Sequence, residues 1–133
     1  MTTDRKTLAL EYLNAVATHQ GRKVEAMLAP DLEFRGPART ITSAAEYVEA
    51  LKRLGAIHVR NDVKRVFVDG DEVCVIYDFV TDTPAGAVTT IEWVRFAGDR
   101  ISSIDLYYDR LPWQTVMAAM AERAARPASQ PTA

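Results

Sequence analysis

The second half of the chain constrains the fold most strongly, because four apolar segments there follow one another with connections too short to hold a helix. The predicted strands span residues 57–68, 72–82, 87–97 and 100–109. The segments between them read DGD, TPAG and AGD, and short connections rich in Gly, Asp and Pro are typical of β-hairpins. The sequence therefore predicts an antiparallel meander in this half.

The first half has mainly helical periodicity. The predicted elements, in chain order, are a helix from residue 3 or 4 to about 18, a short helix over 22–30, a strand over 31–37 and a helix over 43–54. Ser43 and Glu46 form the capping-box pattern that starts a helix, and Gly55 is a stop signal. Pro112 is predicted to lie in the first turn of a last helix, where its missing amide proton costs nothing.

Helices followed by a run of strands indicate an α+β domain, in which helices cover one face of an antiparallel sheet. The length of 133 residues fits a single domain. We predict this domain over 1–126 and a mobile tail at 127–133, which has nothing to bury. We expect a cone-shaped, strongly curled antiparallel sheet wrapped around the N-terminal helices. Such a cone encloses an apolar cavity, the usual setting for a small hydrophobic ligand.

Charge and composition argue against several classes of function. The 16 basic and 18 acidic residues are interspersed, so no nucleic-acid partner is expected. Cys74 is the single cysteine, and His19 and His58 lie far apart in the sequence, so no metal site is expected. No glycine-rich phosphate loop is present, and no cofactor is expected. The absence of a signal peptide and of a long apolar run predicts a soluble cytoplasmic protein without a membrane partner.

Three runs of residues carry a resemblance to a known family: EYLNAVATHQGRKVEAMLAPDLEFRGP at 11–37, SAAEYVEALKRL at 43–54 and VKRVFVDGDEVCVIYDFVTDTPAGAVTTIEWVRFAGDRISSIDLYYD at 63–109. In these runs and in the order of its elements, the chain resembles the SnoaL-like group of the nuclear transport factor two-like superfamily. The resemblance implies the cone-shaped α+β fold and a homodimer formed through the outer face of the sheet. This group holds isomerases, hydrolases, cyclases, dehydratases and non-catalytic binding modules, so the fold leaves the activity open.

The resemblance to ketosteroid isomerases implies a site for an enolate oxygen. In those enzymes a tyrosine and a protonated acid hold this oxygen while an aspartate moves the proton. Tyr12 matches the tyrosine and Glu92 matches the acid, whereas the position of the base falls on Gly36. The chain therefore carries the stabilising groups of that reaction but not its base.

The resemblance to limonene-type epoxide hydrolases implies a role for Asp78. Asp78 matches one of the two aspartates that act on water together with an arginine, but the other two positions fall on Ile76 and Leu106. SnoaL-type cyclases also use an acid at the position of Leu106. Asp105 would replace that acid only after a one-residue shift in register, which turns the side chain to the other face of the strand.

Glu92 and Trp93 are neighbours in the predicted strand TTIEWVRF, so one of them faces the interior. Burial preference alone favours an inward Trp93, together with Ile91. A sheet that dimerises through its outer face, as the resemblance implies, can instead bury Trp93 against a second subunit. On this interpretation Glu92 faces the cavity, and the alternative leaves Trp93 in the core.

The candidate catalytic residues are Tyr12 and Glu92, as donors to an oxyanion, and Asp78, as a base or an activator of water. A carboxyl group in an apolar cavity favours its neutral form, which can donate a hydrogen bond. The structural alternatives are a core position for Tyr12 and an ion pair of Asp78 with Arg65 or Arg95.

Several other side chains are candidates for the wall or the mouth of the cavity. The predicted walls are Phe34, Tyr47, Leu106 and Tyr108. The residues interpreted as packing are Tyr77, Tyr107 and Asp109. His58 is interpreted as a solvated strand end, with a general base at the cavity mouth as the alternative.

Two hypotheses about function follow. The first is an acid/base enzyme of isomerase, cyclase or dehydratase type that acts on a small hydrophobic carbonyl or polyketide-like compound. The second is a non-catalytic module that binds a small hydrophobic molecule and whose acids are structural. The first hypothesis requires a carboxyl group in contact with the cavity and a second titratable group near the same reacting atom.

Overall fold

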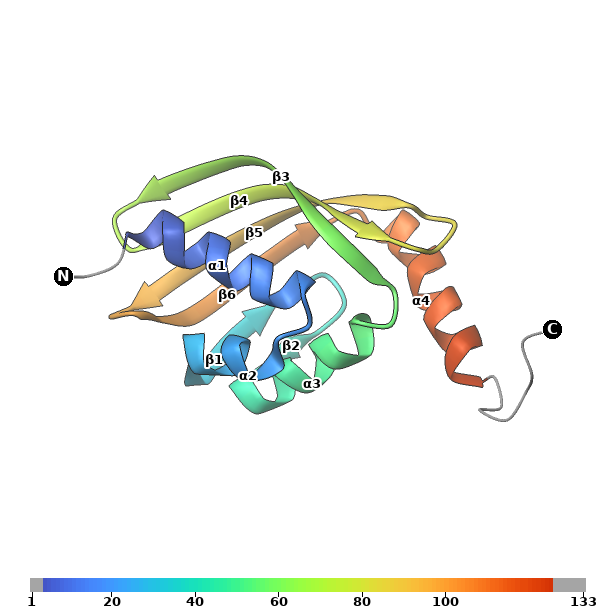
Figure 1. The fold of residues 1–133 in the computed structure, drawn as a ribbon, viewed down its shortest axis with the longest axis horizontal. Coiled ribbons are helices and arrows are strands. Elements are labelled where there is room, and N and C mark those ends of the chain that lie inside the picture. Colours follow the sequence, from blue (N-terminus) through green and yellow to red (C-terminus); the bar gives the residue numbers. More distant parts are fainter. Residues whose placement is uncertain (1–3, 126–133) are drawn as a thin grey trace.

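The computed structural model describes residues 4–125, and this part of the chain contains four helices and six strands (Figure 1). The helices are α1 (Arg5–Ala17), α2 (Gly21–Met27), α3 (Ala44–Leu54) and α4 (Arg110–Ala125). The strands are β1 (Leu28–Arg35), β2 (Thr40–Ile41), β3 (His58–Asp69), β4 (Glu72–Thr81), β5 (Ala87–Ala97) and β6 (Arg100–Tyr108). The predicted tail at 127–133 lies outside the described residues.

The strands form one curled sheet that does not close on itself, in the order β2-β1-β6-β5-β4-β3 (Figure 1). The α+β class is confirmed, and β3 to β6 form the predicted antiparallel meander. The sheet departs from the predicted antiparallel arrangement at one place, because β1 pairs with β6 in parallel. A parallel pair needs a long crossover, and the segment that runs through α3 and the rest of the meander supplies it.

The chain enters β1 earlier than predicted. The short helix was expected to continue to Pro30, but it ends at Met27 and the strand begins at Leu28. Leu28 is buried and pairs with Ile101 of β6, and the register then shifts before Glu33. Pro30 lies within this irregular stretch, where a residue without an amide proton is tolerated. Pairing with β6 therefore overrides the local helical pattern.

Two of the hairpin connections are closed by glycine. Gly70 between β3 and β4 and Gly98 between β5 and β6 have φ angles of 60° and 62°. These left-handed values are the ones that two-residue hairpin turns require, and glycine adopts them without steric cost. The turns fix the register of the meander, and with it the face to which each side chain points.

The core lies between α1 and the inner face of the sheet. α1 runs across this face (Figure 1), and its Ala9, Tyr12 and Leu13 are buried there, at the three-to-four-residue spacing of one helical face. Alternate residues of β4 and β5 face α1 and are buried: Val73, Val75, Tyr77 and Phe79 on β4, and Val88, Thr90, Glu92, Val94 and Phe96 on β5. The inner face is thus apolar except near the middle of β5.

The start of α3 is capped as the sequence predicts, although only half of the predicted capping box forms. The hydroxyl of Ser43 accepts a hydrogen bond of 3.1 Å from the backbone amide of Glu46. The carboxylate of Glu46 instead accepts a hydrogen bond of 3.3 Å from Nη2 of Arg39. The side chain of Ser43 therefore satisfies one of the amides that the first turn leaves unpaired.

Replacing Ser43 by alanine should lower the free energy of unfolding by about 0.5–2 kcal/mol, because this amide then loses its partner. Urea denaturation measures the difference, and Thr42→Ala, at the exposed residue just before the cap, is the matched control. Equal losses in the two variants would contradict a capping role for Ser43.

Candidate functional site: a cavity with a buried acid

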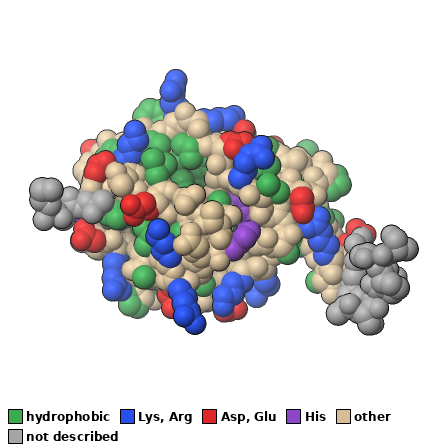
Figure 2. Space-filling model, viewed as in Figure 1, with side chains coloured by type: hydrophobic (Ala, Val, Ile, Leu, Met, Phe, Trp, Pro, Cys, Tyr) green, Lys and Arg blue, Asp and Glu red, His purple; other side chains and the backbone are tan. Residues whose placement is uncertain are grey.

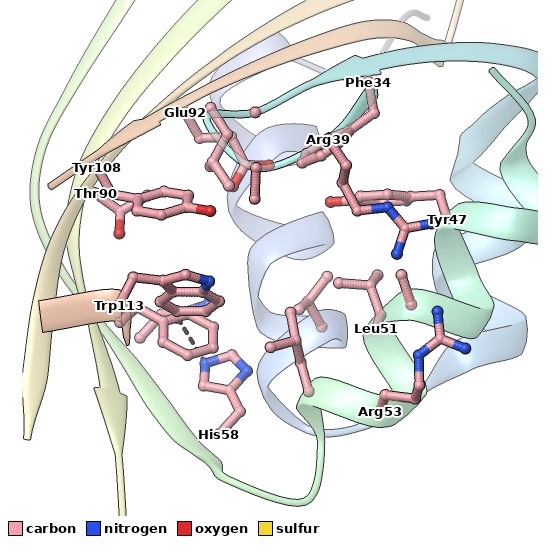
Figure 3. Close-up of a pocket in the computed structure, with 18 of the residues that line it drawn as sticks. Phe34, Arg39, Tyr47, Leu51, Arg53, His58, Thr90, Glu92, Tyr108 and Trp113 are labelled. Atoms are coloured by element: carbon pink, nitrogen blue, oxygen red, sulfur yellow. Dashed lines mark hydrogen bonds between the residues drawn. The ribbon is translucent and has the colours of Figure 1, made fainter. Parts of the chain in front are cut away.

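A cavity of about 190 Å³ lies between the inner face of the sheet, α1, α3 and α4 (Figure 3). Its walls are mostly apolar and aromatic. The four residues predicted as walls, Phe34, Tyr47, Leu106 and Tyr108, line it, and so do Tyr12 and Glu92. In Figure 3 the hydroxyl groups of Tyr47 and Tyr108 point into the cavity from opposite sides. The fold therefore brings two of the three predicted catalytic residues together in one space.

The alternation of β5 places Glu92 inside and Trp93 outside. Glu92 is 3% exposed and lines the cavity. On the outer face, the indole nitrogen of Trp93 donates a hydrogen bond of 2.7 Å to Oε1 of Glu72. The guanidinium group of Arg95 lies 3.7 Å from the centre of the indole ring. Cation stacking and this hydrogen bond accommodate Trp93 on the outer face, so the acid takes the inner position.

The carboxyl group of Glu92 is only half satisfied by its surroundings. The hydroxyl of Tyr77 donates a hydrogen bond of 2.7 Å to Oε1. Oε2 is buried and has no hydrogen-bond partner within residues 4–125. In the same cavity the hydroxyl groups of Tyr12 and Tyr47 are hydrogen-bonded to each other. Three phenol groups and one carboxyl group thus share the buried end of an apolar cavity.

Burial sets the protonation of this cluster. It raises the pKa of Glu92, and the hydroxyl groups of Tyr77 and Tyr12 only partly offset that rise. Burial, followed by the charge of Glu92, also raises the pKa values of the phenol groups of Tyr12, Tyr47 and Tyr77 well above the ordinary value. A low-dielectric site favours the neutral form of each acid. The cluster therefore favours states in which the acids keep their protons and donate hydrogen bonds.

Asp78 does not belong to this cluster. It lies on the outer face of β4, where its carboxylate accepts a hydrogen bond of 2.8 Å from the Thr89 hydroxyl and pairs with Nζ of Lys64 at 3.3 Å. The hydrogen bond from Thr89 is the main cause that lowers its pKa. Neither Arg65 nor Arg95 is its partner: Lys64 of the neighbouring strand β3 pairs with Asp78, and Arg95 pairs with Glu72 and Asp105 instead. The expected catalytic role of Asp78 in the cavity is therefore wrong.

The register of β6 places position 106, which the resemblance to cyclases assigns to an acid, on the inner face of the sheet. Leu106 lines the cavity, whereas Asp105 lies on the outer face and its Oδ1 is 2.7 Å from Nε of Arg35. The position of the cyclase acid is thus a leucine, and the neighbouring aspartate is held in an ion pair on the other side of the sheet.

A family model described as a SnoaL-like domain matches residues 9–104. The chain belongs to the SnoaL-like family. No curated protein matches the sequence significantly.

Solved structures show the same fold at low sequence identity. An NTF2-like protein of unknown function from Cytophaga hutchinsonii is 20% identical, with a TM-score of 0.74 over 86% of this chain and 97% of that chain. A candidate SnoaL-like polyketide cyclase from Shewanella putrefaciens is 16% identical, with a TM-score of 0.72 over 91% of this chain and 88% of that chain. TerC, co-crystallised with polyporic acid, is 12% identical, with a TM-score of 0.73 over 86% of this chain and 98% of that chain.

The position of the ketosteroid isomerase base is a glycine beside an aromatic ring in this SnoaL-like chain. Gly36 lines the cavity, and a Cβ atom there would lie 3.2 Å from Cζ of Phe34, closer than ordinary van der Waals contact. A side chain at position 36 would therefore require the ring of Phe34 to shift by a few tenths of an ångström.

Two cavity residues were missed by sequence reasoning. Tyr77 was interpreted as packing, yet it is the group that holds Glu92; its parity with Val73 and Val75 on β4 was the signal that placed it inside. His58 was interpreted as a solvated strand end, yet it is 5% exposed, lines the cavity and stacks on Phe79 at a centroid distance of 4.0 Å. Burial is the main cause that lowers its pKa, which favours the neutral ring.

The imidazole of His58 is committed to a hydrogen bond. Its Nε2 lies 2.7 Å from Oδ1 of Asn61. Asn61 is oriented by its own Nδ2, which donates to the carbonyl of Leu13 at 3.3 Å. In this orientation the amide oxygen of Asn61 faces the ring, so Nε2 carries the proton and donates a hydrogen bond to Oδ1 of Asn61. The ring therefore serves as a cavity wall, with one nitrogen already occupied.

α4 lies outside the residues matched by the family model and covers one end of the cavity. Trp113 packs against Tyr108 and Phe79, with ring centroids 4.9 and 5.7 Å apart. Near the end of α4, Arg123 pairs with the carboxylate of Asp82 at 2.8 Å and donates to the carbonyl of Ala56 at 3.0 Å. These contacts hold the last helix over the cavity, a role that its sequence did not reveal.

No group of three or more His, Cys, Asp or Glu side chains within residues 4–125 is arranged to hold a metal ion. No helix in the same range is long and apolar enough to span a membrane. Figure 2 shows acidic and basic side chains interspersed over the face that it presents, without a continuous basic surface there.

The raised pKa of Glu92 gives a pH-dependent cost to the fold. As pH rises above the ordinary pKa of a glutamate, the unfolded chain ionises while the folded chain keeps the proton, so the stability contributed by the protonated group is lost. Replacing Glu92 by glutamine removes this dependence. The free energy of unfolding of Glu92→Gln, relative to the wild type, should therefore increase between pH 4 and pH 8 in urea denaturation experiments. A difference that stays constant with pH would show that Glu92 titrates normally.

Proposed function

We propose that this SnoaL-like chain is an enzyme that stabilises the enol or enolate form of a small apolar carbonyl compound, as in a tautomerisation or the cyclisation of a polyketide-like compound. The observation that carries this proposal is Oε2 of Glu92, a buried carboxyl oxygen in a cavity wall with no partner within residues 4–125. A carbonyl oxygen of a ligand would satisfy it. Buried polar groups without a partner are rare in folded proteins and call for such an explanation.

The proposed role of Glu92 is to donate its proton in a hydrogen bond to the substrate oxygen. Tyr77 holds Oε1 and so orients the carboxyl group. When the substrate loses a proton from the carbon next to its carbonyl group, negative charge develops on this oxygen and the hydrogen bond from Glu92 strengthens. In a cavity that excludes water this gain is larger than in solution, so it lowers the barrier rather than only binding the substrate.

The hydrogen-bonded pair of Tyr12 and Tyr47 supplies a second donor. One hydroxyl group donates to the other, and the accepting hydroxyl keeps its own proton for a further hydrogen bond. Whichever direction the pair adopts, the accepting hydroxyl keeps a proton that it can donate at the buried end of the cavity, to the carboxyl group of Glu92 or to a ligand. We propose that this proton reaches the same substrate oxygen.

The groups available to remove a proton from the substrate limit the class of substrate. Glu92 is the one carboxyl group among the described residues that line the cavity, and His58 already uses one nitrogen on Asn61. The site has strong hydrogen-bond donors but no carboxylate base. It therefore suits a substrate whose C–H proton is acidic enough for water to remove it, such as a 1,3-dicarbonyl compound. The fold shared with a candidate SnoaL-like polyketide cyclase and with TerC, which was co-crystallised with polyporic acid, supports an oxygen-rich substrate of this kind.

The lack of a carboxylate base also favours a second candidate function. A cavity with apolar walls and a donor cluster can bind a small hydrophobic carbonyl compound without transforming it. In that case Glu92 and the tyrosines fix the orientation of the ligand.

We also propose a homodimer formed through the outer face of the sheet. No helix covers this face in the described part of the chain, and three large apolar side chains are exposed there: Phe67 of β3, Ile91 of β5 and Tyr107 of β6, at 57%, 38% and 52%. Ile91 and Tyr107 are direct cross-strand partners, and Trp93 lies two residues further along β5 on the same face. A second copy would cover this face with the same face of its own sheet, as a two-fold interface requires.

Glu92→Gln should reduce turnover by about 100-fold, because an amide keeps the shape of the acid but its N–H is a much weaker acid and stabilises developing negative charge less. The enol–keto interconversion of aromatic 1,3-diketones such as benzoylacetone can be followed by the absorbance of the enol. Addition of Tyr12→Phe should abolish the remaining acceleration. Asp78→Asn, which changes an acid on the outer face, is the control and should keep full activity.

The outcomes separate the two candidate functions. Acceleration by the wild type that survives Glu92→Gln would overturn the proposed role of this acid. Binding of the diketones that depends on Glu92, without any acceleration, would favour the binding module.

The dimer proposal predicts that Ile91→Glu yields a monomer at concentrations where the wild type sediments as a dimer. A charge buried in an interface without a partner costs several kcal/mol. Leu111→Glu, at an exposed apolar residue of α4, is the control and should remain dimeric in sedimentation velocity. A wild type that sediments as a monomer would exclude this interface.

A further inference from the structure

The cavity is electrically asymmetric. At its buried end, Glu92 favours the protonated form and the tyrosine hydroxyl groups are neutral. At its exposed end, Arg39 and Arg53 line the cavity. The described lining therefore contains two arginines and a single carboxyl group, Glu92, whose neutral form is favoured by burial, although the whole chain has a net charge of −2. Low-dielectric walls concentrate such a local field within a cleft.

The two arginines come from different parts of the chain. Arg39 immediately precedes β2, and Arg53 lies in the last turn of α3. Figure 3 shows both guanidinium groups on the side of the cavity formed by Tyr47 and Leu51. The fold thus gathers two cations at one edge of an apolar space.

Neither guanidinium group is fully used within the protein. Arg39 has one hydrogen bond of 3.3 Å, to the exposed carboxylate of Glu46. No hydrogen bond or ion pair from the guanidinium group of Arg53 to another residue of 4–125 is formed. An arginine presents five donors in a planar fork that matches a carboxylate, so most of this donor capacity is available to a ligand.

We infer that the ligand of this cavity is an amphipathic anion: an apolar body with a carbonyl oxygen at the buried end and a carboxylate at the mouth, held by Arg39 and Arg53. The carbonyl end of this inference rests on the proposed function, whereas the carboxylate end rests on the arginines alone. The volume of about 190 Å³ is below the roughly 300–1,000 Å³ of pockets for drug-sized ligands, which limits the body to one or two rings.

Arg53 also has an ordinary structural role to be separated from this one. A cation in the last turn of a helix is stabilised by the helix dipole. Lys52 shares that turn and has its own ion pair with Glu49 at 3.0 Å, but it does not line this cavity. Lys52→Gln therefore removes the same helix-terminal charge without touching the mouth. Arg60, exposed and paired with Asp62 at 2.9 Å, provides a second control outside the cavity.

The test uses two pairs of probes that differ only in charge: 4-acetylbenzoate with 4-acetylbenzamide, and 6-acetyl-2-naphthoate with 6-acetyl-2-naphthamide. Each has a ketone at one end and a carboxylate or its neutral amide at the other. Isothermal titration calorimetry on the full chain measures the dissociation constants at low and high salt. In at least one pair, the wild type should bind the carboxylate roughly ten-fold more tightly than the amide, a preference that salt reduces.

Substitution of the arginines should remove this preference. Arg39→Gln and Arg53→Gln should each weaken carboxylate binding by roughly three- to ten-fold, as expected for partly exposed charge-assisted hydrogen bonds. Binding of the amide should be unchanged, and the double variant should bind the acid and the amide alike. Lys52→Gln and Arg60→Gln should behave as the wild type, and thermal unfolding should show that all variants remain folded.

Three results would overturn the inference: equal binding of acid and amide by the wild type, a loss of carboxylate binding that Lys52→Gln reproduces, or no binding of any of the four probes. The variant Glu92→Gln shows whether a negative result concerns the carboxylate site at the mouth or the proposed enolate site at the buried end. If Glu92→Gln weakens the acid and the amide equally while the wild type shows no preference between them, the enolate site stands and the anion site is excluded. If the preference depends on the arginines while Glu92→Gln has no effect, the carboxylate site stands and the enolate site is excluded.

Discussion

The half-satisfied carboxyl group of Glu92 is the constraint on which the inner face of the sheet depends. The buried hydroxyl group of Tyr77 holds one oxygen of this acid, while the other oxygen lacks a partner among the described residues. Leaving a buried polar atom unpaired costs on the order of 1–3 kcal/mol, a considerable part of the roughly 5–15 kcal/mol that stabilises a domain. An apolar residue at this position would avoid that cost. The arrangement is therefore better explained by an occupant of the cavity than by the stability of the fold.

The acids of the central strands divide into two kinds according to the face on which they lie. On the outer face, Asp78 pairs with Lys64, and Asp105 pairs with Arg35. These acids have their partners within the chain and need no ligand. On the inner face, no cation pairs with Glu92 among the described residues, and burial raises its pKa, which favours the protonated form. A one-residue shift in register would exchange the two faces of a strand. The hairpin turns that fix the register therefore also decide which acid faces the cavity.

The local parts of this structure could be predicted from the sequence, and the parts that depend on distant contacts could not. The glycines in DGD and AGD specify tight turns by their own backbone preference, and Ser43 specifies a helix start by its own hydroxyl group. The parity of Tyr77 with Val73 and Val75 was present in the sequence, but its importance depends on Glu92, which only the pairing of β4 with β5 brings opposite. The partner of Asp78, Lys64, depends on the pairing of β3 with β4, which neither strand specifies by its own sequence. The parallel pairing of β1 and the place of α4 likewise follow from how the whole chain closes.

The ring of Phe34 links the missing base to the charge of the cavity. It lies beside Gly36, where a Cβ atom would be in tight contact with it and where the resemblance to ketosteroid isomerases places an aspartate. An aspartate at this position would add a negative charge that repels an anionic ligand. Without it, Glu92 is the one carboxyl group among the described lining residues, and negative charge that develops on a substrate oxygen has no second carboxylate nearby. The absence of a base at position 36 and the proposed binding of an anion are therefore consistent with each other.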